Sequence, residues 1–260
     1  MKKNQNFLTK NENTKSFIKN NKFPNKMLHH ITAITEKIKE NYEFYTKTLG
    51  MTFVKKTVNF DDPTTYHLYY GDKDGNPGSL ITFFYYEGKG QRGQGYAEGI
   101  IMEVPTEIYA KLGPIVEDPD GLTLKLKPGK DYKTIGVITT ANKEFLEKWG
   151  LDSENEYKEY EHEGQMGAGI IHHVAHQTPN IDTQRELKKK LNQEGIRTSD
   201  IIERTYFKSI YFQEENSCLQ EVATNGPGFF IDEEELGSKL VLPPWYEKYR
   251  KEIEARLPEL

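Results

Sequence analysis

The chain has 260 residues, which suits one large domain or two small ones. Its formal net charge of -5 comes without a basic stripe, so nucleic-acid binding has no electrostatic footprint. The single cysteine, Cys218, excludes an internal disulfide and favours a reducing compartment, and no apolar run approaches the ~18 residues of a membrane span. We therefore expect a cytoplasmic protein without nucleic-acid or membrane partners.

Residues 1–26 are rich in Lys and Asn and lack the apolar core of a secretory signal. We expect a flexible polar extension there. The sequence leaves the oligomeric state open, and a homo-oligomer is one of the states it allows.

Residues 27–95 predict a β-α-β-β-β unit. Alternating apolar and β-prone residues predict its strands, and an apolar stripe with helical spacing predicts its helix. The expected strands are 27–34, 51–60, 65–70 and 79–86, and the expected helix is 36–49. The Gly-rich stretch 88–95 is a loop too irregular for a dinucleotide-binding fingerprint.

Residues 170–232 repeat this order of elements. The expected strands are 171–176, 196–203, 205–213 and 218–224, with a turn at 214–217, and the expected helix is 182–193. Asp182 is the candidate N-cap residue of that helix. Residues 96–169 between the two units hold two curtailed echoes with a helix over 143–149, and residues 233–260 predict a strap that ends in a helix over 247–255.

Five of the seven histidines lie in two similar strands, Leu28–Ala33 and Ile171–His176. By alternation, His30 and His173 lie on apolar faces of these strands, and Glu221 lies on an apolar face of the last strand of its unit. A carboxylate on such a face is costly unless it is paired or binds a cation.

Two imidazoles and one carboxylate form the 2-His-1-carboxylate ligand set, which leaves metal positions open for catalysis. His30, His173 and Glu221 are therefore candidate metal ligands. Spacing alone does not decide the question, because it does not show that the two units face each other. A core role for the histidines and an ion pair between Glu221 and Arg204 remain alternatives.

The remaining histidines and the cysteine have simpler interpretations. His67 is expected to be a hydrogen-bonded sheet residue, although a ligand role is open. His162 lies in an acidic, exposed stretch, and His176 is a residue behind the site or on the surface. Cys218 is expected to be a small packing residue and not a nucleophile.

Several motifs in order resemble the vicinal-oxygen-chelate superfamily, which includes glyoxalases, bleomycin-resistance proteins and extradiol dioxygenases. The closest resemblance is to the ring-cleaving hydroquinone-type dioxygenases. The motifs are Leu28-His29-His30-Ile31-Thr32, residues 41–51, residues 66–84, His172-His173-Val174-Ala175, Ser209-Ile210-Tyr211-Phe212, residues 221–229 and Leu242-Pro243-Pro244-Trp245.

The resemblance implies an α+β fold of repeated β-α-β-β-β modules, which form open, incompletely closed barrels of mixed sheet. It implies metal ligands at His30, His173 and Glu221. Five further positions near the metal are implied: His29, Thr32, His172, Arg204 and Tyr211. The middle modules are shorter here than in the family, which affects how the site is enclosed.

The resemblance also implies the chemistry: cleavage of a hydroquinone- or catechol-type diol by O2 with Fe(II), or with Mn(II), and no organic cofactor. Proton transfer would fall to His29, His172 and Tyr211, and Arg204 would stabilise a developing anion. Two alternatives stay open. One is a non-redox metalloenzyme of the same fold, such as a glyoxalase-like isomerase or thiol transferase, and the other is a non-catalytic protein that binds an aromatic ligand.

Overall fold

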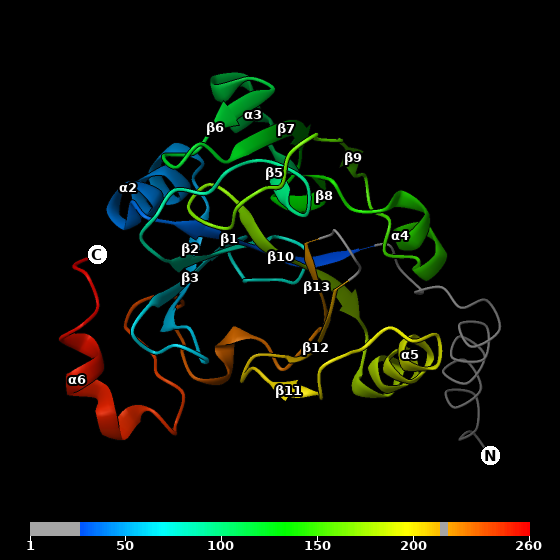
Figure 1. Cartoon of the computed structure of the whole chain (residues 1–260). Helices are drawn as coiled ribbons and strands as arrows, with labels where there is room; N and C mark the ends of the chain where they lie inside the picture. Colours follow the sequence, from blue (N-terminus) through cyan, green and yellow to red (C-terminus); the bar gives the residue numbers. More distant parts are fainter. Residues whose placement is uncertain (1–26, 214–217) are drawn as a thin grey trace, which may run out of the picture.

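The computed structural model describes residues 27–213 and 218–260, which form one mixed sheet of 13 strands with helices on its outside (Figure 1). The predicted extension, 1–26, and the predicted turn, 214–217, lie outside the described residues. Two strands at the centre, β1 (Leu28–Thr35) and β10 (Ile171–Thr178), run antiparallel to each other, with Thr32 opposite His173.

The first and last units have the predicted β-α-β-β-β order. After β1, the first unit contains α2 (Ile38–Glu43), a π-helical turn η1 (Phe44–Thr48), β2 (Thr52–Val58), β3 (Tyr66–Gly71) and β4 (Leu80–Tyr85). After β10, the last unit contains α5 (Ile181–Gln193), β11 (Ile202–Glu203), β12 (Lys208–Phe212) and β13 (Leu219–Thr224).

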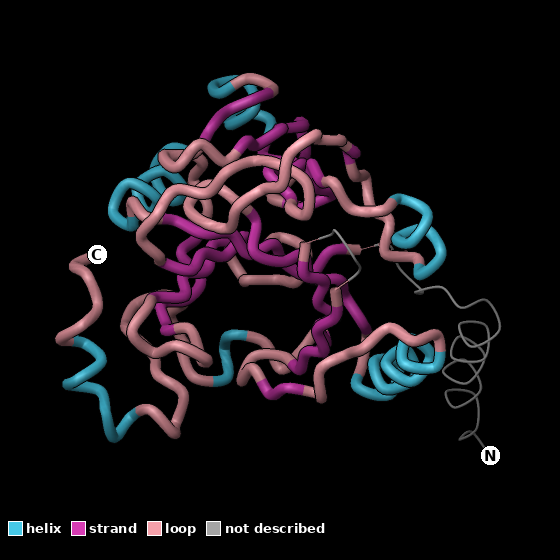
Figure 2. The backbone as a smooth tube through the Cα atoms, viewed as in Figure 1, coloured by secondary structure: helices cyan, strands magenta, loops and turns pink. Residues whose placement is uncertain are grey.

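The two units also have the same strand order within the sheet, β1-β4-β3-β2 on one side and β10-β13-β12-β11 on the other. Strand β4 is parallel to β1, and β13 is parallel to β10. Both halves curve away from the central pair toward the same side, as the strands in Figure 2 show. The antiparallel contact of β1 with β10 therefore joins two like units into one open, incompletely closed barrel.

The middle units are curtailed, as expected. They consist of β5 (Ala97–Pro105), α3 (Thr106–Leu112), β6 (Ile115–Glu117) and β7 (Thr123–Gly129), and then β8 (Lys133–Thr139), α4 (Lys143–Trp149) and β9 (Glu156–Tyr157). Two strands follow α3 and a single short strand follows α4, where the complete units have three. The middle units join the sheet through the pairing of β5 with β10.

The C-terminal tail packs against the first unit. It contains the 3-10 turn η3 (Glu247–Tyr249) and the short helix α6 (Arg250–Glu254), and it follows the 3-10 turn η2 (Phe229–Ile231) at the end of the last unit. Leu242 and Ile253 form a small apolar cluster with Val58 of β2. The Tyr246 hydroxyl donates a hydrogen bond of 3.0 Å to the backbone oxygen of Phe60, which fixes the tail to the loop between β2 and β3.

One helix prediction was wrong in its second half. Residues 36–49 were expected to form a continuous α-helix, but α2 widens into η1, where the backbone N–H of Leu49 donates to the oxygen of Phe44 at 2.9 Å. Tyr45 lies in this turn, and its ring stacks on that of Tyr70 at 5.0 Å and contacts Phe83 at 4.8 Å. The wider turn accommodates one extra residue and fits this aromatic packing. A sequence pattern with a period of 3.6 residues does not predict such an insertion.

Two predictions for the last unit also need correction. The N-cap of α5 is Asn180, whose side chain accepts from the Thr183 N–H at 2.9 Å, and Asp182 instead lies in the first turn. The strand expected over 196–203 is regular only at its end, since the preceding residues make separate bonds such as Ser199 N–H to the Tyr211 oxygen at 2.8 Å.

Candidate metal centre

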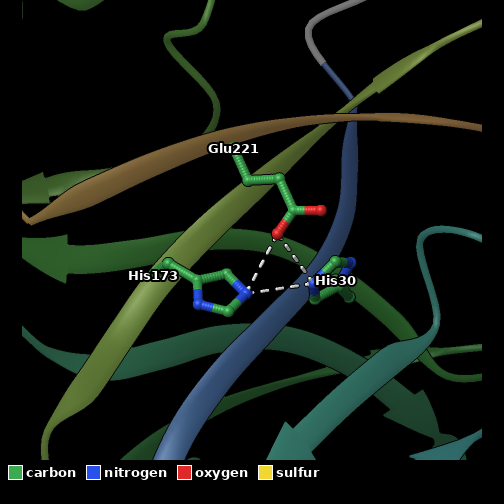
Figure 3. A group of neighbouring side chains, drawn as sticks. All are labelled: His30, His173 and Glu221. Carbon is green, nitrogen blue, oxygen red and sulfur yellow. Dashed lines mark hydrogen bonds and ion pairs between the residues drawn. The ribbon is translucent and has the colours of Figure 1, made fainter. Parts of the chain in front are cut away.

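His30, His173 and Glu221 come from three neighbouring strands, β1, β10 and β13, and their side chains point toward one another (Figure 3). Pairing of β1 with β10 places Thr32 opposite His173, and pairing of β10 with β13 places Ala175 opposite Glu221. The sheet register therefore brings together residues that lie at opposite ends of the chain.

The three side chains meet through one atom each. His30 Nε2 lies 3.2 Å from His173 Nε2, and Glu221 Oε2 lies 3.4 Å from the first and 3.1 Å from the second. All three side chains are buried. Within the described ranges, this is the one group of at least three His, Cys, Asp or Glu residues with ligand atoms close enough to hold a metal ion.

The two oxygens of Glu221 differ in their surroundings. Oε1 accepts a hydrogen bond from the Ser209 hydroxyl, whereas Oε2 is buried without a hydrogen-bond donor. Burial alone would raise the pKa of Glu221, but the neighbouring His30 and His173 outweigh burial and hold that pKa well below its usual range. The site therefore contains a buried carboxylate anion with one oxygen unsatisfied.

Each of the two imidazoles has a second histidine behind it. His29 Nδ1 lies 2.9 Å from His30 Nδ1, and His172 Nδ1 lies 2.8 Å from His173 Nδ1. Burial, with a smaller contribution from the adjacent histidine, lowers the pKa of both His29 and His172 to about 3. Both are therefore neutral at neutral pH. The Nδ1 atom of His29 can accept a hydrogen bond from His30, and the Nδ1 atom of His172 can accept one from His173.

This arrangement matches the needs of a metal ligand. A histidine that binds a metal through Nε2 carries its proton on Nδ1, and a partner that accepts this proton fixes the ring orientation. His29 and His172 supply that acceptor. A cation between the two Nε2 atoms and Glu221 Oε2 would also give the unsatisfied oxygen a partner, so the donor set fits a divalent metal with open positions.

A cavity of about 260 Å³ lies over the three side chains and is lined by residues of the first and last units. Its walls include the rings of Tyr69, Phe84, Phe207 and Tyr211, and Asn59 and Arg204 add polar groups. This size and lining suit a single aromatic ring with polar substituents.

Arg204 and Tyr211 form one hydrogen-bonded pair in the cavity wall. Arg204 Nε donates to the Tyr211 hydroxyl at 3.1 Å, and the guanidinium also pairs with Asp61 at 3.1 Å. Burial, with a smaller contribution from the negative Glu221, holds the pKa of Tyr211 well above its usual range. Arg204 is thus paired with Asp61 and not with Glu221, which removes the ion-pair alternative for that carboxylate.

The other residues considered from the sequence occupy different positions. Thr32 is fully buried, bonds Thr82 at 2.7 Å and is not part of the cavity lining. His67 does line the cavity, and its two ring nitrogens contact the hydroxyls of Thr82 at 2.9 Å and Tyr69 at 3.0 Å. His67 is therefore the hydrogen-bonded sheet residue that was expected.

Three further assignments can be checked. His162 is exposed, as expected. His176 is buried and contacts Gln220 at 2.9 Å, so a surface position was wrong. Burial raises the pKa of Cys218 to about 12, which keeps its thiol protonated and agrees with a packing role.

The sequence did not reveal the roles of Ser209 and Phe207. Ser209 lies two residues before Tyr211 on β12, so strand alternation alone would have placed both on the face of Glu221. Phe207 lies in a turn, and its ring contacts His29 at 4.8 Å and His30 at 5.3 Å. No periodic pattern marks a residue in such a turn.

The sequence of this chain matches the model of a known protein family. The model of the Glyoxalase/Bleomycin resistance protein/Dioxygenase superfamily matches residues 27–222. The chain belongs to this superfamily. The match begins at β1 and ends in β13, so it contains the three candidate ligands.

Relatives within the superfamily match most of this chain. MhqE of Bacillus subtilis (strain 168), provisionally named a ring-cleaving dioxygenase, is 34% identical over 90% of this chain and 98% of its own length. The chlorohydroquinone/hydroquinone 1,2-dioxygenase of Sphingobium indicum is 26% identical over 87% of this chain and 94% of its own.

Solved structures give the same fold. The crystal structure of a provisionally named dioxygenase from Bacillus subtilis superimposes with a TM-score of 0.80 at 30% identity, covering 92% of this chain and 98% of that one. A glyoxalase I variant from Zea mays, with a TM-score of 0.56 at 13% identity over 76% of this chain and 94% of that one, shares the fold alone. In the part of the chain that the structure describes, every helix is too short or too polar to cross a membrane.

Proposed function

We propose that this protein is a metal-dependent dioxygenase that opens the ring of a hydroquinone- or catechol-type diol with O2, and that His30, His173 and Glu221 bind its metal. Two relatives that this chain matches over nearly their full length support the reaction class: one is provisionally named a ring-cleaving dioxygenase, and the other is named a chlorohydroquinone/hydroquinone 1,2-dioxygenase. The observation that carries the ligand assignment is the buried Glu221 Oε2, which lacks a hydrogen-bond donor beside two converging imidazole nitrogens.

We propose Fe(II) as the metal, with Mn(II) as the alternative. Two neutral imidazoles and one carboxylate are the ligand set of non-haem Fe(II) oxygenases, and they leave positions for a diol oxygen and for O2. When bound by His30, His173 and Glu221, the metal would supply positive charge that lowers the pKa of a substrate hydroxyl, and it would activate O2.

The residues around the cavity bind and orient the ring. Phe84 and Phe207 offer apolar faces beside the histidines of the site. The ring centroids of Phe84 and His173 are 6.2 Å apart, and those of Phe207 and His30 are 5.3 Å apart. A diol ring between these walls is held close to the ligand atoms, which removes much of the entropy of encounter. The same walls exclude water from the reacting ring.

His172 is the residue we assign to hydrogen-bond donation to the substrate. His172 Nδ1 faces His173 Nδ1 and accepts a hydrogen bond from it. A neutral His172 then carries its own proton on Nε2. His172 also lines the cavity, where that Nε2–H is available to a diol oxygen or a reaction product. His29 is not part of the lining, and we assign it the orientation of His30 alone.

Arg204 and Tyr211 are assigned to the stabilisation of negative charge on the substrate. Tyr211 keeps its proton because its pKa is raised by burial, so it serves as a hydrogen-bond donor and not as a base. Arg204 places a permanent positive charge beside it, with Nε bonded to the Tyr211 hydroxyl. Together they can stabilise negative charge that develops on the substrate oxygen atoms.

The test is anaerobic reconstitution of the full chain with Fe(II) or Mn(II), followed by O2 uptake on a panel of hydroquinones and catechols. We expect uptake with at least one diol and incorporation of both atoms of ¹⁸O2 into a ring-opened product. Binding of the diols without uptake would indicate the non-catalytic alternative. Turnover of an isomerase or thiol-transferase substrate without O2 would indicate the non-redox alternative, and either result would refute the proposal.

A further inference from the structure

The turn between β11 and β12 contains a strained residue next to the cavity. Thr205 has a φ of 65°, and it is the only residue other than glycine with a positive φ among those the structure describes. A β-branched residue rarely adopts this left-handed conformation, because its side chain crowds the backbone. Strain of this kind persists only where surrounding contacts impose it, and it gathers at functional sites.

The strained turn presents its residues to two opposite sides. Arg204 and Phe207 line the metal cavity, whereas Thr205 and Tyr206 line a groove behind it that is bordered by the C-terminal tail. Two backbone hydrogen bonds close the turn, from Arg204 N–H to the Phe207 oxygen at 2.9 Å and from Tyr206 N–H to the Arg204 oxygen at 2.7 Å. Contacts that fix the position of Tyr206 therefore also fix the positions of Arg204 and Phe207.

Tyr206 is held from behind by a cluster of charges. Its hydroxyl donates to Asp232 at 3.0 Å, and Lys55 Nζ lies 4.8 Å from the centre of its ring. Lys55 is fully buried on β2 and also binds Asp232, at 2.6 Å, and Glu233. These four side chains, Lys55, Tyr206, Asp232 and Glu233, are called the Tyr206 clasp below.

The clasp joins three parts of the chain. Lys55 belongs to the first unit, Tyr206 and Asp232 to the last unit, and Glu233 to the tail. A buried lysine with carboxylate partners is not a cheap way to gain stability, because well-packed apolar residues of the same volume are often as stable or more so. This costly cluster lies directly behind the cavity wall, which favours a role in positioning the residues of that wall.

We propose that the Tyr206 clasp positions Arg204 and Phe207 over the candidate metal centre, so that its four members are positioning residues of the reaction. The inference rests on the proposed function. The geometry that the clasp maintains is visible at two contacts: Arg204 Nε to the Tyr211 hydroxyl at 3.1 Å and the Phe207 ring to the His30 ring at 5.3 Å. Loss of the clasp would loosen both contacts without removing any group that touches the substrate.

Two mild substitutions test the clasp. Tyr206→Phe removes the hydroxyl bond to Asp232 and keeps the ring, and Asp232→Asn removes the negative charge of one partner of Lys55 at a residue that is exposed to solvent. The control is Glu156→Gln, which breaks the Lys125–Glu156 pair of the middle units, far from the turn in sequence and sheet order. If one clasp variant fails to fold, the other carries the test.

The first readout needs no metal. In the ¹⁵N-labelled, metal-free chain, the Arg204 Nε–H signal reports the bond to Tyr211, and it is assigned by its loss in Arg204→Lys. We expect this signal to shift or broaden in both clasp variants and to stay unchanged in Glu156→Gln. An unchanged Arg204 signal in a folded clasp variant would overturn the proposal.

The second readout is steady-state kinetics of the Fe(II)-loaded chain with the diol of the panel that wild type consumes fastest. We expect the clasp variants to lose about tenfold or more in kcat/KM at unchanged metal content, because small displacements of groups around a substrate are costly. Values within twofold of wild type would contradict the role in the reaction. If wild type consumes no O2, the proposed function fails, and the Arg204 signal still decides whether the clasp positions that residue.

Discussion

His30 Nε2 and His173 Nε2 lie 3.2 Å apart, although 143 positions separate the two residues in the chain. The contact exists because β1 and β10 are antiparallel neighbours at the centre of the sheet. Each strand opens a β-α-β-β-β unit, and each carries a His-His pair in which the second histidine faces the site. The candidate metal centre therefore lies on the approximate symmetry between the first and last units.

Removal of the carboxylate ligand should abolish stable metal binding. We expect Glu221→Ala to lower Fe(II) affinity at least 100-fold, since even residues that only support metal ligands are worth about 10–100-fold. Metal content after gel filtration, measured by elemental analysis, checks the result. His162→Ala, at an exposed histidine, is the matched control and should keep one metal per chain. Full occupancy in Glu221→Ala would rule out the ligand assignment.

The histidines behind the ligands should tune metal affinity. His172→Phe keeps an aromatic ring but removes the acceptor that lies 2.8 Å from His173 Nδ1. We expect metal affinity to fall by about 10–100-fold, because the orientation and tautomer of His173 are no longer fixed. Competition against a chelator measures this. An affinity equal to that of wild type would show that His172 does not orient His173.

Tyr211 should act as a protonated donor at all working pH values. Because burial raises its pKa far above neutral pH, its hydroxyl does not titrate where the enzyme works. We therefore expect Tyr211→Phe to lower kcat/KM by about 10–100-fold, as for loss of a group that stabilises developing charge. The pH-rate profile should keep its shape. A limb that disappears from the profile in Tyr211→Phe would instead indicate a base.

The buried His176 should make the fold sensitive to acid. Burial lowers its pKa to about 4, while the value in the unfolded chain is near 6.5. Between these values the unfolded chain binds the extra proton, so the free energy of unfolding falls as the pH drops from about 6.5 to about 4.

Replacement of His176 should remove this sensitivity. Between pH 7 and pH 5, the free energy of unfolding of His176→Asn should fall by about 2 kcal/mol less than that of wild type. The figure follows from a loss of about 1.4 kcal/mol per pH unit below pH 6.5 in wild type. Urea unfolding at the two pH values measures both proteins, and the other buried histidines cancel in the comparison. Parallel pH dependences would show that His176 does not contribute.

Much of the fold and of the site follows from local patterns. Alternation on short strands placed His30, His173 and Glu221 on buried faces, and the repeated order of elements suggested that both units share one architecture. The step that the sequence could not supply is the register of β1 with β10, which depends on pairing across the whole chain. The order of the strands in the sheet decides which faces meet.

Other parts of the site depend on contacts that have no periodic signature. The Tyr206 clasp joins segments far apart in sequence, since 177 positions separate Lys55 from Asp232. The N-cap moved from Asp182 to Asn180, since the geometry of the first turn and not residue type alone selects a cap. Such features are set by tertiary packing, which composition and spacing do not encode locally.

The most direct test of the central claim is the position of the metal itself. Crystals of the chain reconstituted anaerobically with Fe(II) can be measured with X-rays at the iron absorption edge. We expect a single anomalous peak among His30 Nε2, His173 Nε2 and Glu221 Oε2, at bonding distance from all three atoms. A peak at another group of residues, or full iron occupancy without contact to these three side chains, would contradict the assignment.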